Sequence, residues 1–157
     1  MTKPGENSAA QRSKNKTAKP TILLVDGDTE THAGAVESLT AAGFDVSVAS
    51  DPGKAFAIME VKFTWSKPSL VIVDLILPQM SGFEFVRRFV DRFEQHKIPI
   101  FMMSKYPSAE DRLEIHSAGA HALLSKPLSG QAVNHELEQM RIKKLKSEIG
   151  VMAFTEK

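Results

Sequence analysis

An aspartate ends a short apolar run near the middle of this 157-residue chain. The run 70–73 is continuous and rich in valine and isoleucine, and Asp74 follows it directly. Such a run is typical of a strand that is covered on both faces. A carboxylate at the C-terminal end of a parallel strand lies at the rim of the sheet, where α/β folds place their chemistry. Asp74 is therefore the first candidate for a functional residue.

Polar side chains also follow the other apolar runs of the chain. They are Asp26, Asp28, Ser104 and Lys126. Because the C-terminal ends of parallel strands are neighbours in space, we expect these side chains to lie near Asp74, although they are far apart in sequence.

The expected group of side chains is suited to phosphoryl transfer. Clustered carboxylates favour a hard cation such as Mg²⁺, which prefers oxygen ligands. An aspartate can act as a nucleophile and form an acyl phosphate. A lysine and a serine can supply a positive charge and a hydrogen-bond donor to phosphoryl oxygens. Transfer of a phosphoryl group needs mainly positioning and charge stabilisation, and these residues offer both.

Strand-like and helix-like segments alternate five times along the chain. Strands are expected over 21–25, 44–48, 69–74, 98–103 and 122–124. Helices are expected from Thr29, Pro52, Gly82, Ser108 and the vicinity of Ser129, on the basis of capping residues and apolar spacing. Alternation of this kind requires parallel pairing and right-handed crossovers. The predicted fold class is α/β, with a doubly wound five-stranded parallel sheet of (βα)5 type.

Composition divides the chain into a domain with two basic extensions. Residues 1–20 carry five basic residues against one acidic residue, which leaves the rest of the chain mildly acidic. We expect a disordered basic tail over 1–20, a domain over 21–140, and a basic helix end and tail over 141–157. A solvated tail is the simpler interpretation, and contact with phosphates or an acidic partner is the alternative. The acidic balance argues against nucleic-acid binding by the folded domain.

Several other classes of protein are excluded or disfavoured. The chain has no cysteine, so it has no disulfide, thiolate metal site or cysteine nucleophile. No apolar stretch has the length of a membrane span, and the polar N-terminus does not resemble a secretory signal. The five histidines are scattered without zinc-ligand spacing. No glycine-rich loop follows the first strand, which argues against a nucleotide-binding function.

In order and spacing, the motifs resemble the receiver domain of bacterial two-component response regulators, and in particular chemotaxis regulators. The resemblance covers about residues 21–140. The segments that carry it are Ile22–Asp26, Val71–Asp74 with Pro78, Met80 and Gly82, Pro99–Ile100, Ser104, Ala118–Ala120 and Lys126–Pro127.

The resemblance implies a flavodoxin-like fold and a cytoplasmic signalling module of a phosphorelay that is not an enzyme. We expect a stand-alone receiver, and a piece of a larger protein is the alternative. It implies that Asp74 accepts a phosphoryl group from a histidine kinase or a histidine phosphotransfer protein. Lys126 would contact that group, and Ser104 would move towards it. The peptide bond between Lys126 and Pro127 is often cis in the family.

The resemblance also implies a bound Mg²⁺ and a downstream protein partner, with no organic cofactor. The expected ligands of Mg²⁺ are Asp26, Asp74 and the backbone carbonyl of Ile76, with Asp28 as a substitute ligand. Lys105, Leu123 and Pro127 are expected on the partner surface. Family members often have an aromatic residue at the position of Leu123, and filling of core space is the simpler role for leucine there.

One residue departs from the family pattern at the expected metal site. Receivers usually carry two adjacent acids after the first strand, and the second, which ligates Mg²⁺ directly, is replaced here by Gly27. Asp28 could substitute for it as a ligand and preserve phosphorylation. Alternatively, the domain is an atypical pseudo-receiver that binds protein partners with weak or no phosphorylation.

Two further segments predict contacts with other proteins. Ile142, Leu145 and Ile149 form an apolar stripe among basic residues near the C-terminal end. This stripe predicts either a homodimer or partner-binding helix, or a frayed solvated end. Phe63 and Trp65 lie in a long segment before Pro68, where packing over the sheet edge and a docking role are the alternatives.

Overall fold

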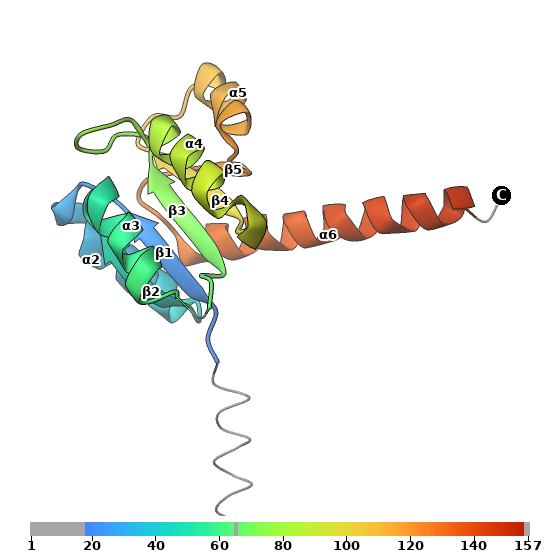
Figure 1. Ribbon diagram of the computed structural model, residues 1–157, viewed down its shortest axis with the longest axis horizontal. Helices are drawn as coiled ribbons and strands as arrows, with labels where there is room; N and C mark the ends of the chain where they lie inside the picture. The colour runs from blue at the N-terminus through green and yellow to red at the C-terminus, as the bar shows by residue number, and fades with distance from the viewer. Residues whose placement is uncertain (1–17, 65, 156–157) are drawn as a thin grey trace, which may run out of the picture.

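A five-stranded parallel sheet forms the centre of the protein (Figure 1). The computed structural model describes residues 18–64 and 66–155, with side chains described up to residue 150. The strand order is β2-β1-β3-β4-β5. The strands are β1 (Thr21–Val25), β2 (Asp45–Ala49), β3 (Leu70–Asp74), β4 (Ile100–Ser104) and β5 (Ala122–Ser125).

Helices alternate with these strands along the chain. They are α2 (Thr29–Ala41), α3 (Pro52–Val61), α4 (Gly82–Phe93), a short 3-10 turn η1 (Glu94–His96), α5 (Ala109–Ala118) and α6 (Gly130–Thr155). The predicted fold class is confirmed, because all four strand pairings are parallel.

Each face of the sheet is covered by its own hydrophobic cluster. In β1, Leu23 and Val25 pack with helices α3, α4 and α5, whereas Ile22 and Leu24 pack with α2 and α6. The same alternation continues along β3. Because side chains alternate between the two faces of a strand, the continuous apolar runs of the sequence correspond to strands buried on both sides.

Local sequence explains where most helices begin. Asp28, Asp51 and Ser108 are N-cap residues whose side chains accept hydrogen bonds from backbone N–H groups of the first turn of their helices. Gly119 ends α5 at a positive φ of 112°, a conformation that glycine adopts without strain.

The largest difference from the predicted elements is at the start of the fourth strand. It begins at Ile100 instead of residue 98. Pro99 has no N–H to donate to the ladder, although its carbonyl accepts a hydrogen bond from Val71 N. Ile98 is nevertheless buried in the core, which explains its apolar character in the sequence.

Helix α6 is longer than the domain needs. Val133 is fully buried, and Leu137 and Met140 pack partly against the core. Beyond this point α6 extends away from the body of the protein (Figure 1), and Leu145 and Ile149 are exposed. Within the described part of the chain, no helix combines the length and the apolar character that a membrane crossing requires.

Two predicted features fall wholly or partly outside the described residues. Most of the expected tail, residues 1–17, lies outside them, and so does Trp65. Phe63 lies within them and is buried with the α3 side of the core, as the packing alternative predicted.

Candidate functional site

The ends of four strands bring the predicted residues to one edge of the sheet. Asp26 follows β1, Asp74 ends β3, Ser104 ends β4 and Lys126 follows β5. Asp26 has no exposed surface and Asp74 is 7% exposed. The structure thus brings these residues together at the edge of the sheet where the sequence predicted them.

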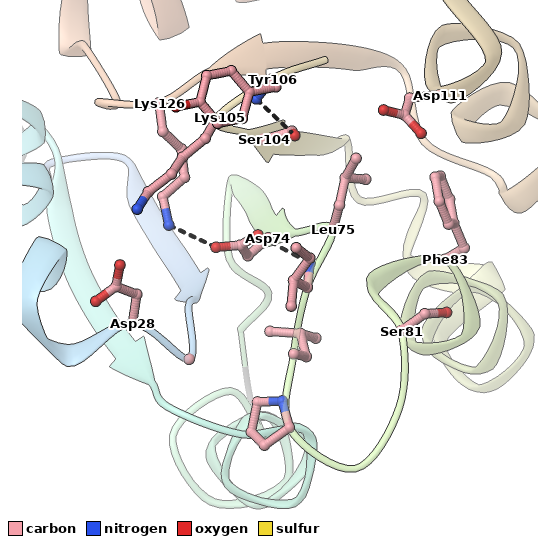
Figure 2. Close-up of a pocket in the computed structure, with 14 residues that line it drawn as sticks. Asp28, Asp74, Leu75, Ser81, Phe83, Ser104, Lys105, Tyr106, Asp111 and Lys126 are labelled. Carbon is pink, nitrogen blue, oxygen red and sulfur yellow. Dashed lines mark hydrogen bonds and ion pairs between the residues drawn. The ribbon is translucent and has the colours of Figure 1, made fainter. Parts of the chain in front are cut away.

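Lys126 connects the two buried aspartates. Its Nζ donates to Asp74 Oδ2 at 2.6 Å and to Asp26 Oδ1 at 3.2 Å, and its side chain is 6% exposed. Figure 2 shows the ammonium group pointing to Asp74 across the floor of the site. The bond between Lys126 and Pro127 is cis, as the resemblance implied.

Asp26 is held by the segment that follows it. The backbone N–H of Asp28 donates to Asp26 Oδ1 at 3.0 Å. The hydroxyl of Thr31 lies 3.1 Å from both Asp26 Oδ2 and the carbonyl oxygen of Asp28, and shares its hydrogen between them. The ring of His32 contacts the backbone carbonyl of Asp26.

Thr31 and His32 were missed in the sequence analysis. Their positions held a detectable signal, because residues in the first turn of a helix lie close to the preceding strand end. When an acidic residue ends a strand, a polar residue at the third position of the following helix is a candidate hydrogen-bond partner for it.

Asp74 is held by fewer donors. The backbone N–H of Ile76 donates to Asp74 Oδ1 at 3.0 Å. Burial raises the pKa of Asp74 above its usual value, although the hydrogen bonds from Lys126 and Ile76 oppose this change. Burial alone would lower the pKa of Lys126, but its hydrogen bond to Asp74 and the charges of Asp74 and Asp26 raise it.

A cavity of about 920 Å³ lies over Asp74 (Figure 2). Its lining includes Ser104 and Lys105, the exposed residues Ile76 and Tyr106, and the side chain of Asp28. The backbone N–H of Tyr106 donates to Ser104 Oγ at 3.2 Å, so the hydroxyl hydrogen of Ser104 remains available for donation.

The three residues expected on the partner surface do not share one environment. Lys105 lies at the mouth of the cavity and is exposed, and Pro127 is also exposed. Leu123 is only 8% exposed and packs in the core, where it fills space as the simpler interpretation predicted.

Two glycines permit close approaches around the acidic residues. A Cβ on Gly82 would lie 2.2 Å from the carbonyl oxygen of Asp74, so only glycine allows α4 to begin so close to the end of β3. A Cβ on Gly27 would lie 2.8 Å from Cδ of Pro78, so a side chain at that position requires the loop after β3 to shift.

The donor set does not fit the predicted Mg²⁺ site. Gly27 supplies no ligand, and the carboxylate of Asp28 accepts from Glu30 N at 3.1 Å as the helix cap. Asp26 already binds Lys126 and two further donors. Within residues 18–64 and 66–155, no cluster of three acidic or histidine side chains has the geometry to hold a metal ion.

Comparison with known proteins identifies the family of this chain. Residues 22–138 match the response regulator receiver domain. The chemotaxis protein CheY4 of Vibrio cholerae is 27% identical and has a TM-score of 0.67, over 78% of this chain and 98% of that chain. A CheY-like receiver domain from Methanospirillum hungatei is 24% identical and has a TM-score of 0.66, over 83% of this chain and 99% of that chain.

Curated relatives match only over part of their own length. The transcriptional regulator RpaA of Synechocystis is 30% identical over 110 residues, which is 69% of this chain and 43% of that protein. An uncharacterised protein of Thiocystis violacea is 31% identical over 75% of this chain but only 16% of its own length. The site at the strand ends and the match over most of the chain agree: the protein belongs to the response regulator receiver domain family, whose members are signalling modules of two-component systems.

Proposed function

We propose that Asp74 accepts a phosphoryl group from a phosphohistidine of a histidine kinase or a histidine phosphotransfer protein in the cytoplasm. The observation that carries this proposal is the position of Asp74 on the floor of the cavity with Lys126 at 2.6 Å. Carboxylate, ammonium and the hydroxyl of Ser104 are the groups that an acyl phosphate needs around it.

The proposed step balances without a further reagent. A carboxylate oxygen of Asp74 forms a bond to phosphorus while the bond from phosphorus to the imidazole nitrogen of the donor breaks. The leaving imidazole takes up a proton from solvent. Lys126 offsets the added negative charge, and Ser104 can donate its hydroxyl hydrogen to a phosphoryl oxygen.

A phosphorylation assay with a small phosphodonor tests the proposal. We expect the wild-type protein to gain one phosphoryl mass, and Asp74→Asn to gain none. Asp111→Asn is the matched control, because Asp111 lines the same cavity and is expected to leave the reaction intact. Labelling of Asp74→Asn, or no labelling of the wild type with any phosphodonor or cation, would overturn the proposal.

A second function is supported by Gly27. Without the usual second acid, the domain can act as a pseudo-receiver that binds a protein partner with little or no phosphorylation. In that case Asp74→Asn keeps both the fold and partner binding. If Asp74→Asn abolishes partner binding and remains folded, this second function is wrong.

The exposed part of α6 supports a signalling contact with another protein or a second copy. Ile142, Leu145 and Ile149 recur at spacings of three and four residues, which places them along one side of the helix. Leu145 is 43% exposed and Ile149 is 64% exposed. Lys105 and Pro127 offer a separate exposed contact surface closer to the acidic residues.

Measurement of molecular mass by light scattering tests the homodimer. We expect association of the wild type at high protein concentration and its loss in a variant with Leu145→Glu and Ile149→Glu. A variant with Lys143→Glu and Lys144→Glu is the control, because it changes charge while leaving the apolar stripe intact. A wild type that is monomeric at all concentrations would exclude the homodimer.

A further inference from the structure

We infer that Lys126 is the built-in counter-ion of this acidic site, and that the resting protein does not bind a divalent cation there. This inference deepens the proposed function: the counter-ion matters for signalling only if Asp74 is phosphorylated. Its claim about cation binding nevertheless concerns the site before any phosphorylation, and it can be tested without a phosphodonor.

The first observation is that Asp26 is buried and already binds three donors. Its Oδ1 accepts from Asp28 N at 3.0 Å and from Lys126 Nζ at 3.2 Å, and its Oδ2 faces the hydroxyl of Thr31 at 3.1 Å. The residue has no exposed surface. A cation at Asp26 therefore competes with donors in a buried place, and any donor that it displaces loses its partner.

The second observation is that the residues nearest to Asp26 supply no replacement ligand. Gly27 has no side chain, and Asp28 caps α2 through its bond with Glu30 N. If the side chain of Asp28 moved towards Asp26, the N–H of Glu30 would lose its acceptor. The stability lost would be that of a typical N-cap. From the expected ligand set there remain Asp74 and the backbone carbonyl of Ile76, and both residues line the cavity. One carboxylate and one carbonyl hold Mg²⁺ weakly unless a phosphate joins them.

The third observation is that the two buried carboxylates already share a cationic partner. Lys126 contacts both carboxylates, and the backbone N–H of Asp28, the N-cap of α2, donates to Asp26. No buried side-chain nitrogen or oxygen of the described residues lacks a hydrogen-bond partner. An orphaned acceptor, which would mark the place of a missing ion, is therefore not found among them.

Thermal unfolding with and without Mg²⁺ tests the inference on the full chain. A site with a Kd of about 1 mM would raise the Tm by roughly 5 °C in about 10 mM MgCl₂. We expect the wild-type Tm to be the same in MgCl₂ and in EDTA with NaCl of equal ionic strength. We expect Lys126→Met, which leaves two uncompensated carboxylates, to be less stable and to gain Tm when Mg²⁺ is added.

The control is Lys105→Met, which removes an exposed charge from the same cavity. We expect it to behave as the wild type does. A millimolar Mg²⁺ affinity of the wild type, by Tm or by calorimetric titration, would overturn the inference even if Lys126→Met failed to fold. A folded Lys126→Met that does not respond to Mg²⁺ would overturn it as well.

A second pair of variants tests the role of Gly27. We expect Gly27→Asp to raise Mg²⁺ affinity by about tenfold or more, because a carboxylate beside a divalent ion contributes more than the ~1.4 kcal/mol that a factor of ten requires. Gly27→Ala shares the close contact with Pro78 but adds no carboxylate, so we expect no gain. Equal affinities of the two variants would contradict the inference.

The outcomes also separate this inference from the proposed function. If the wild type does not bind Mg²⁺ at rest but is phosphorylated on Asp74, both are supported. If it binds Mg²⁺ at rest and is phosphorylated, only the inference fails. If it neither binds Mg²⁺ at rest nor gains a phosphoryl group, only the proposed function fails.

Discussion

Asp26 and Asp74 carry the same carboxyl group but have different surroundings. Asp26 has three donors and no exposed surface. Asp74 has two donors and reaches the cavity, and burial raises its pKa. Two buried carboxylates share one ammonium, so one of them is in excess. Asp74 is the carboxylate that reaches the cavity, which is consistent with a residue held for reaction and not for stability.

The first prediction concerns replacement of Asp74. The pKa of Asp74 is higher in the folded state than in the unfolded state. The wild type therefore loses free energy of unfolding as the pH rises from the unfolded-state pKa through the folded-state pKa. This loss is still present at neutral pH. Asn lacks this titration, and Lys126 keeps its bond to Asp26. We expect Asp74→Asn to have a higher Tm than the wild type at pH 7 and to lose this advantage in acid.

Thermal unfolding by circular dichroism over a pH series measures this difference. Asp91→Asn, at an exposed position of α4, is the control for a change of net charge. A lower stability of Asp74→Asn at pH 7 would show that the pair with Lys126 stabilises the fold more than burial of Asp74 costs.

The second prediction concerns Asp26, where the opposite sign is expected. Alanine at this position would remove the acceptor of Lys126, of Asp28 N and of the hydroxyl of Thr31 in a buried place. We expect Asp26→Ala to lower the free energy of unfolding by about 2 kcal/mol, which is a typical cost of a buried unsatisfied group. Denaturant unfolding measures it, and an unchanged midpoint would contradict the assigned hydrogen bonds.

At the scale of elements, the junction between β3 and α4 places the acceptor residue. The backbone N–H of Gly82 donates to the carbonyl of Leu75 at 2.8 Å, and the loop between them forms one wall of the cavity. The start of α4 thus lies against the backbone of Asp74. A change in this junction moves the carboxylate without altering any residue of the site.

The third prediction follows from this junction. A methyl group at position 82 would lie 2.2 Å from the carbonyl oxygen of Asp74 and 2.8 Å from Cα of Leu75. We expect Gly82→Ala to cost about 1–3 kcal/mol, which is the range for overpacking. Gly34→Ala is the matched control, because a Cβ there meets no atom within 4 Å. Equal stability of the two variants would contradict the close approach.

The fourth prediction concerns the C-terminal half of α6. Side chains from Arg141 to Gly150 are exposed except for Ile142, which is half-buried. We expect a chain that ends after Met140 to keep the Tm of the full chain within about 3 °C, since exposed positions contribute little to stability. A larger loss of Tm at low protein concentration would show that the extension packs within one copy.

At the scale of the whole molecule, one sheet joins two hydrophobic clusters. Strands β1, β3 and β4 have a neighbouring strand on both sides, and helices cover both faces. Each cluster contains side chains from the same central strands, so neither can form without the sheet. We therefore expect cooperative unfolding of the domain as a single unit.

The fifth prediction concerns amide hydrogen exchange in the native state. We expect the slowest exchange in β1 and β3, which open only in global unfolding, and fast exchange in α6 beyond Met140. The difference between these regions should approach the full free energy of unfolding. Exchange measured by mass spectrometry checks it, and protection of the α6 extension equal to that of β1 would indicate a partner for that helix.

The sequence by itself determined the order and direction of the elements. Strongly apolar strands, N-cap residues such as Ser108 and stop residues such as Gly119 are local signals, and local signals survive in a single sequence. Asp74 and Lys126 could be predicted for the site because each follows a strand, and strand ends of a parallel sheet have one common edge.

Only the tertiary structure decided how those side chains share their charges. Asp26 and Lys126 are separated by 100 positions, and nothing in the sequence states that one ammonium contacts both aspartates. The sequence left open whether Asp28 substitutes for the missing acid, because a carboxylate can either ligate a cation or cap a helix. In the fold Asp28 caps α2, a placement that depends on distances that local patterns do not encode.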